Sequence, residues 1–208
     1  MKRYVVEFIG TFFLILVIGL SVIAPGAGAL APLAIGSVLM VMVYAGGYIS
    51  GGHFNPAVTL GVWIRGMVET RDAVLYMIAQ VLGGAVAAGA VLVLKAGSTI
   101  TPFLPNPSAA LVAEFLFSFA LVYVVLNVST SAKNAGNSYY GLAIGFTLMV
   151  AAFTIGNISG SAINPAVAIG LTIVGLSALA NLWIYIVADL IGGAAAAVVF
   201  RYLNEGEE

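Results

Sequence analysis

Cysteine is absent from this chain of 208 residues, and charged side chains make up only 7% of it. Without cysteine there is no disulfide framework, thiol nucleophile or thiolate metal site, and mercurial reagents have no thiol to attack. The single histidine, His53, cannot build a metal site alone, and no motif indicates a cofactor. The net charge of −1 comes with no basic stripe that could neutralise phosphates, so nucleic acid is excluded as a partner.

Hydrophobic residues, by contrast, make up 62% of the chain, and the mean hydropathy is +1.14. A soluble domain carries about 25% charged residues, so this composition indicates an integral membrane protein. Glycine, proline and charge divide the chain into six runs of the length, about 20 residues, that a bilayer-spanning helix needs. We predict these helices at approximately 4–24, 33–50, 71–94, 109–129, 139–157 and 179–202. Two shorter runs near 55–65 and 164–173 are candidate half-helices.

Both candidate half-helices begin with the tripeptide Asn-Pro-Ala. Asparagine is favoured at a helix N-cap and proline at the first helical position, so each tripeptide predicts a helix start. At membrane depth such a start is tolerated only where it is buried in protein or faces a watery path. Two of them suggest a pore. The residues are Asn55, Pro56 and Ala57 in the first copy and Asn164, Pro165 and Ala166 in the second.

The two halves of the chain repeat at a nearly constant spacing. The matched pairs are Glu7 and Glu114, 107 residues apart, and Asn55 with Asn164 and Gln80 with Asp189, each 109 apart. Each half holds three spanning helices, an odd number, so the second half enters the membrane from the opposite side. We therefore expect an all-α membrane protein with six transmembrane helices and two half-helices, a single channel domain over 1–208 with inverted repeats of approximately 1–95 and 108–208. Inverted repeats usually place a permeation site at the midplane between them.

The basic residues predict the orientation. If the N-terminus is cytoplasmic, only Lys95 of the seven basic residues falls on the outer side, which is the bias expected for membrane proteins. We expect both termini in the cytoplasm and the protein in the plasma membrane. The six residues on the inner side are then Lys2, Arg3, Arg65, Arg71, Lys133 and Arg201.

In this topology the N-terminal ends of the two half-helices point at one another across the midplane. Each end carries about half a positive charge, which opposes a cation or a proton but not a neutral polar molecule. Asn55 and Asn164 can each donate an N–H to a passing oxygen while their carbonyl oxygens cap the half-helices. The sequence therefore predicts passive permeation of small neutral molecules.

The chain resembles the aquaporin (major intrinsic protein) family over essentially its whole length. The resemblance rests on Ser-Gly-Gly-His-Phe-Asn-Pro-Ala-Val-Thr from Ser50, on Ser-Ala-Ile-Asn-Pro-Ala-Val from Ser161, and on Glu7 and Glu114. It implies a homotetramer in the lipid bilayer with one pore per subunit. The symmetric placement of the two glutamates favours a bracing role, in which each accepts backbone N–H bonds from a half-helix loop. His53 is expected to bond loop backbone too, with pH gating as its alternative role.

One departure from the family concerns the narrowest constriction, where an arginine usually follows the second Asn-Pro-Ala. Here that position is Val167, and a slip of one residue in the fifth helix would replace Ala152 by Phe153. The set most resembles plant tonoplast intrinsic proteins, and it predicts a broad pore for water, urea, ammonia and hydrogen peroxide, with glycerol less favoured. Counted from the two motifs, the constriction residues are Ile35, Ala152, Ser161 and Val167.

Two other functional classes use the same residues. Glu7 and Glu114 could carry protons in a proton-coupled secondary transporter, which would show saturable uptake. An intramembrane serine protease would pair His53 with Ser159 or Ser161, although no third group is evident to orient the histidine. A junctional or structural role with residual permeability is a further alternative.

Overall fold

The computed structural model describes residues 1–206, and these residues form helices joined by loops, with one isolated bridge between Phe103 and Ser177. Six helices are long and apolar enough to span a membrane. They are α1 (Lys2–Val22), α2 (Ala31–Ser50), α4 (Thr70–Leu94), α5 (Pro107–Thr130), α6 (Tyr140–Ser159) and α8 (Leu182–Leu203), and two short helices, α3 (Pro56–Ile64) and α7 (Pro165–Val174), lie between them. Single 3-10 turns occupy Gly28–Leu30, Ala132–Asn134 and Leu179–Asn181.

The two short helices begin where the Asn-Pro-Ala motifs predict. Asn55 has an extended backbone, and its side-chain oxygen accepts from the Ala57 N–H at 2.8 Å. The oxygen of Asn164 accepts from the Ala166 N–H at 2.9 Å and from the Val167 N–H at 3.4 Å. Proline occupies the first turn of each helix, where its missing N–H costs nothing.

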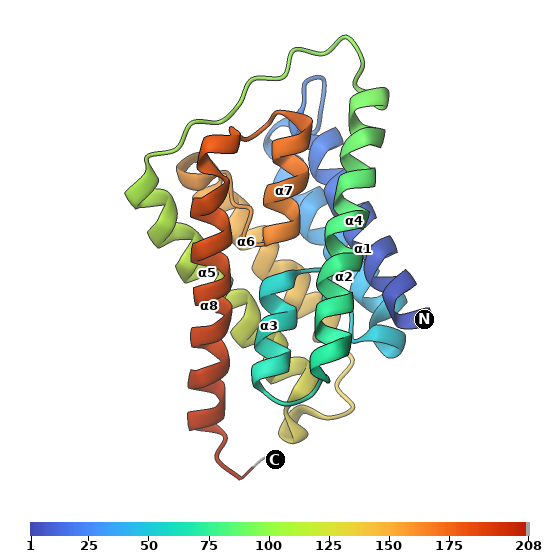
Figure 1. Ribbon diagram of the computed structural model, residues 1–208, viewed down its shortest axis with the longest axis vertical. Coiled ribbons are helices and arrows are strands. Elements are labelled where there is room, and N and C mark those ends of the chain that lie inside the picture. Colours follow the sequence, from blue (N-terminus) through green and yellow to red (C-terminus); the bar gives the residue numbers. More distant parts are fainter. Residues whose placement is uncertain (207–208) are drawn as a thin grey trace.

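The helices pack in matching pairs from the two halves of the chain. Helix α1 packs against α4 and α2, just as α5 packs against α8 and α6, while α2 and α6 contact one another. Each short helix lies against a long helix of the other half, α7 against α4 and α3 against α8. Figure 1 shows α4 and α8 running in opposite directions, with α3 in the lower half of the bundle and α7 in the upper half. This is the inverted arrangement that the sequence predicts.

Glycines bring the matching helices into close contact. A Cβ atom at Gly83 of α4 would lie 2.4 Å from the Phe8 carbonyl oxygen of α1. At the matching position, a Cβ at Gly192 of α8 would lie 2.6 Å from the Phe115 carbonyl oxygen of α5. No side chain fits at either point, so these glycines set how closely α1 approaches α4 and α5 approaches α8.

Three of the basic side chains mark the two ends of the bundle. Arg3 at the start of α1 forms an ion pair with Asp72 at the start of α4. Arg201 near the end of α8 donates to the Ile64 carbonyl at the end of α3, 3.5 Å away. Lys95, at the far end of α4, instead donates to the Ile23 carbonyl at 2.8 Å. Lys95 therefore lies at the opposite end of the bundle from the two arginines.

Candidate functional site

The N-termini of α3 and α7 meet head to head through their cap residues. Asn55 Nδ2 donates to the Ile163 carbonyl at 2.9 Å, and Asn164 Nδ2 donates to the Phe54 carbonyl at 2.9 Å. Since each cap oxygen already accepts from its own helix, each asparagine amide retains one N–H beyond these bonds. Two N–H groups and two helix N-termini therefore converge at one point.

Phe54 and Ile163, which precede the two asparagines, have an unusual backbone. Their φ angles are +49° and +37°, in the left-handed region that apolar side chains avoid, and both residues are buried. Such a conformation costs on the order of 1–3 kcal/mol. The two residues with this conformation are those whose carbonyl oxygens accept a hydrogen bond from the asparagine of the other half. Phe54 and Ile163 were not predicted from the sequence, although their shared position directly before Asn-Pro-Ala is a usable signal.

A narrow cavity lies at this meeting point. The space open to the centre of a water molecule is about 10 Å³, which is room for about one water. The polar side chains in its lining are His53, Asn55 and Asn164. The loop residues Phe54, Ala162 and Ile163 also line it, and the remaining walls are aliphatic. The aliphatic lining residues include Leu14, Leu39, Val58, Leu121, Val125, Ile144 and Leu148. A molecule passing this point meets few polar groups besides those of the two loops.

Glu7 holds the loop before α3, as its repeat position predicts. Its Oε1 accepts from Ser50 Oγ at 2.6 Å and from the His53 N–H at 3.0 Å. Its Oε2 accepts from the Phe54 N–H at 2.7 Å and from Gln80 Nε2 at 2.8 Å. The carboxylate is fully buried, and these four donors satisfy it.

The predicted role of His53 needs one correction. Its backbone N–H is bound by Glu7, but its ring Nδ1 contacts the Thr59 hydroxyl at 3.1 Å rather than loop backbone. The same hydroxyl accepts from Gln80 Nε2 at 2.9 Å and donates to the Asn55 carbonyl at 3.0 Å. Thr59 lies one turn into α3, which places its side chain beside the cap residue.

Glu114 holds the second loop in the corresponding way. Its two oxygens accept from the Ala162 N–H at 3.1 Å and from the Ile163 N–H at 2.6 Å. Asp189 stands where Gln80 stands in the first half, and Ser118 Oγ donates to it at 2.9 Å. Asp189 and Glu114 are both fully buried.

Two tyrosines bind the C-terminal ends of the helices that lead into the loops. Tyr76 of α4 donates to the Ser50 carbonyl at 2.8 Å, and Tyr185 of α8 donates to the Ser159 carbonyl at 2.7 Å. In each pair the tyrosine follows the serine by 26 residues in the sequence. The role of the tyrosines was not predicted from the sequence, although the 109-residue spacing that relates the asparagines also relates Tyr76 to Tyr185.

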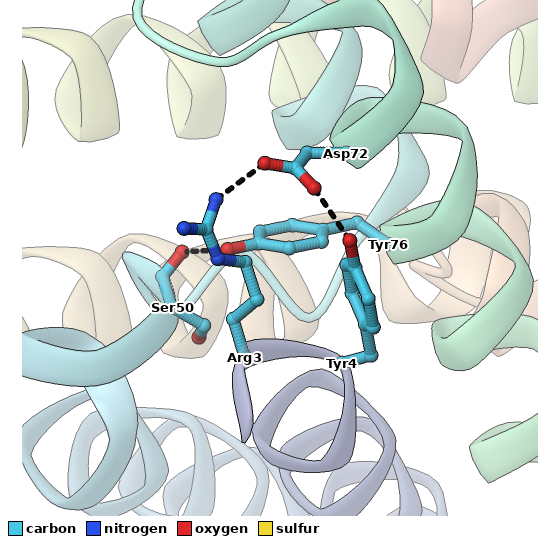
Figure 2. Close-up of polar contacts among 5 residues, drawn as sticks. All are labelled: Arg3, Tyr4, Ser50, Asp72 and Tyr76. Atoms are coloured by element: carbon cyan, nitrogen blue, oxygen red, sulfur yellow. Dashed lines mark hydrogen bonds and ion pairs between the residues drawn. The ribbon is translucent and has the colours of Figure 1, made fainter. Parts of the chain in front are cut away.

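A wider cavity of about 440 Å³ lies at the end of the bundle where the chain begins. Figure 2 shows Arg3 and Tyr4 bound to Asp72, with Tyr76 and Ser50 beside them. The lining includes Arg3, Ser50, Asp72 and Tyr76, and also His53 and Val125, which line the narrow cavity too. A charged vestibule therefore adjoins the narrow passage between the asparagines.

The predicted constriction residues do not line the narrow cavity between the asparagines. Ile35 and Val167 are buried, whereas Ala152 and Ser161 are half-buried. Phe153 is 57% exposed and shares the outer face of α6 with Phe146, Val150 and Leu142. This exposure favours Ala152 over Phe153 for the constriction. That Ala152 lies together with Ile35, Ser161 and Val167 in one constriction remains a prediction.

The family model described as "Major intrinsic protein" matches residues 1–200. The chain is 40% identical to "Glycerol uptake facilitator protein-like 6" of Lactiplantibacillus plantarum, with 98% of this chain and 99% of the relative covered. It is 38% identical to "Aquaporin NIP1-4" of Oryza sativa, with 98% and 77% covered. The aquaglyceroporin structure from Plasmodium falciparum shares its fold, with a TM-score of 0.80 at 21% identity over 96% of this chain and 94% of the other.

The His53 ring bonds the hydroxyl of a threonine, Thr59, and not that of a serine, so this contact is not a serine–histidine dyad. The six apolar helices identify an integral, multi-pass membrane protein. The chain belongs to the major intrinsic protein family, whose aquaporins and glycerol facilitators are channels for water and small solutes and not enzymes.

Proposed function

We propose that this channel conducts water together with urea, ammonia, hydrogen peroxide and glycerol, and that it excludes ions and protons. The observation that carries the proposal is Val167, which follows the second Asn-Pro-Ala and supplies neither a charge nor a side-chain donor. The match to a relative named as a glycerol uptake facilitator supports including glycerol. The other constriction residues in the proposal are Ile35, Ala152 and Ser161.

Ion exclusion is assigned to the head-to-head half-helices. Each N-terminus contributes about half a positive charge, and the cap residues are bonded to each other's loops, so the two charges lie close together. A cation at this point would exchange its water shell for an unfavourable field and aliphatic walls, whereas a neutral solute needs only a hydrogen bond. The remaining N–H groups of Asn55 and Asn164 can supply that bond.

The broad solute range is assigned to the constriction. An isopropyl side chain at Val167 leaves room that a guanidinium would fill. Ser161 Oγ has no hydrogen-bond partner among residues 1–206, so no other group of the described chain occupies its hydroxyl. One hydroxyl among otherwise apolar side chains discriminates weakly between small polar molecules.

Swelling of proteoliposomes in gradients of water, urea and glycerol tests this assignment. Val167→Arg is expected to reduce urea and glycerol flux several-fold or more and to reduce water flux less. Val167→Met is the matched control, because it adds length without charge or donors. An unchanged urea flux in Val167→Arg would show that Val167 does not line the constriction.

The kinetics of the same fluxes separate a channel from a proton-coupled transporter. A channel gives flux that rises linearly with the gradient, whereas transport through Glu7 or Glu114 would saturate and respond to a pH gradient. Both carboxyls are fully buried and hold loop N–H groups, which fits bracing.

The assembly and location that we propose are a homotetramer in the plasma membrane, with both termini in the cytoplasm. The apolar outer face of α6, which carries Phe146 and Val150, is available to lipid or to a neighbouring subunit. Native mass spectrometry of the detergent-solubilised protein measures the subunit number directly. A species of one subunit only would contradict the tetramer.

A further inference from the structure

The two bracing glutamates have different partners, although the rest of the repeat matches. Gln80 Nε2 donates to Glu7 at 2.8 Å in the first half. In the second half the corresponding residue is Asp189, whose buried carboxyl is close enough to that of Glu114 to interact with it directly. An ionised carboxylate has no hydrogen to donate, so Asp189 can replace the glutamine amide only in its neutral form.

The surroundings of Asp189 are those of a neutral acid. The residue is fully buried, and Ser118 Oγ donates to its Oδ1 at 2.9 Å. Its Oδ2 accepts no hydrogen bond from residues 1–206. The Asn164 backbone N–H is near the carboxyl but forms no such bond with Oδ2. Two ionised carboxylates in contact at full burial would repel one another in a medium of low dielectric constant.

No nearby cation compensates for a second negative charge. Helices α3 and α7, which pack against α8, contain no titratable residue. The charged and titratable groups around Asp189 are Glu114 on α5 and Tyr185 on its own helix. Arg201 is three turns further along α8, roughly 18 Å away at 1.5 Å per residue.

We propose that Asp189 and Glu114 form a proton-binding site, in which Asp189 holds the proton and its Oδ2–H donates to Glu114. Glu114 remains ionised and keeps the Ala162 and Ile163 N–H bonds. Asp189 thus acts as a positioning residue for the loop before α7, as Gln80 does for the loop before α3. This inference concerns a protonation state and does not depend on which solute the channel conducts.

A pH response follows from this site. Removal of the proton places two like charges in contact behind the second loop, which carries Ile163 and its bond from Asn55. Flux is then expected to decline reversibly at alkaline pH, once the Asp189 proton is lost. This consequence, unlike the site itself, rests on the proposed channel function.

Infrared spectroscopy of the full chain in lipid vesicles tests the site directly. A protonated carboxyl has a carbonyl-stretch band separate from the bands of ionised carboxylates. The sequence contains two aspartates, Asp72 and Asp189, and Asp72 is paired with Arg3. We expect the wild type to show this band near neutral pH, to shift it when aspartate carries carbon-13 at the side-chain carboxyl, and to lose it in Asp189→Asn.

Three results would overturn the proposal: no such band in the wild type, a band that shifts only with labelled glutamate, or a band that persists in Asp189→Asn. The wild-type labelling experiment decides the matter even if the variant fails to fold. Gln80→Glu is the matched control, since it builds the same carboxyl pair in the first half. It should add a second band that aspartate labelling leaves in place, and its absence would show that such pairing does not require a proton.

Swelling assays then separate the two proposals. Asp189→Asn keeps an amide donor that does not titrate, so its flux should not decline at the pH where wild-type flux does. An infrared band in a chain that conducts none of the solutes would refute the proposed function and leave the proton site standing. Normal flux in a chain without the infrared band would refute the proton site and leave the proposed channel function standing.

Discussion

Thr59 joins three parts of the first half through a single hydroxyl. The hydroxyl hydrogen points to the Asn55 carbonyl, 3.0 Å away, so the contact with His53 Nδ1 at 3.1 Å requires hydrogen on that ring nitrogen. The neutral ring then leaves Nε2 as an acceptor, and His53 lines both the vestibule and the narrow cavity. Thr59 thus sets which nitrogen of His53 faces these two cavities as an acceptor.

Thr59→Val tests this network with little change in side-chain shape. The substitution leaves Gln80 Nε2 and His53 Nδ1 without their shared buried acceptor, which costs about 1–3 kcal/mol for each unsatisfied group. We expect a lower melting temperature in detergent, by roughly 2–4 °C per kcal/mol for a chain of this size. Thr154→Val is the control, because that threonine is exposed and bonds only its own helix. Equal shifts in the two variants would contradict the network.

The residues that sequence reasoning could identify were those that the repeat duplicates. Asn55 and Asn164 cap their helices, and Glu7 and Glu114 bind the loops, as their spacing indicated. Thr59 has no such counterpart, because the position 109 residues later is Ala168. Its role depends on how α3 packs against α4, which brings Gln80 to it, and no local pattern records that contact.

At the scale of the elements, helix bounds were predictable to within three residues. Long apolar runs interrupted by proline, glycine or charge leave few alternatives in a bilayer, where every backbone group needs a partner. The loops between elements were less predictable. Phe54 and Ile163 adopt positive φ angles although neither is glycine, because each carbonyl is bonded by the asparagine of the opposite half. That requirement arises only when the halves meet.

Gly83→Ala tests the glycine contact between α4 and α1. The added Cβ would lie 2.4 Å from the Phe8 carbonyl oxygen, so the helices have to separate. We expect a lower melting temperature and loss of the monodisperse peak in size-exclusion chromatography. Gly89→Ala on the same helix is the control, since its Cβ meets nothing within 4 Å. There alanine should be neutral or stabilise by up to about 1 kcal/mol, because it has the higher helix propensity. A stable Gly83→Ala would show that close approach is not required.

At the scale of the whole molecule, six crossings return the chain to the side on which it began. Arg3 and Arg201 lie at one end of the bundle and Lys95 lies at the other. The vestibule with the Arg3–Asp72 pair opens at the first of these ends, which the distribution of basic residues predicts to be the cytoplasmic end. The architecture alone is compatible with either orientation, because the inverted halves present similar helices to both sides.

The absence of cysteine makes this orientation directly measurable. Ala135→Cys lies in the exposed loop between α5 and α6, and Thr99→Cys lies in the exposed loop between α4 and α5, at the opposite end. A membrane-impermeant maleimide should label Thr99→Cys in intact cells and Ala135→Cys only in inside-out vesicles. The unmodified chain is the blank, since it has no thiol. The reverse pattern would place the Arg3 vestibule outside the cell and contradict the inference from the basic residues, while labelling of both variants from both sides would indicate mixed insertion.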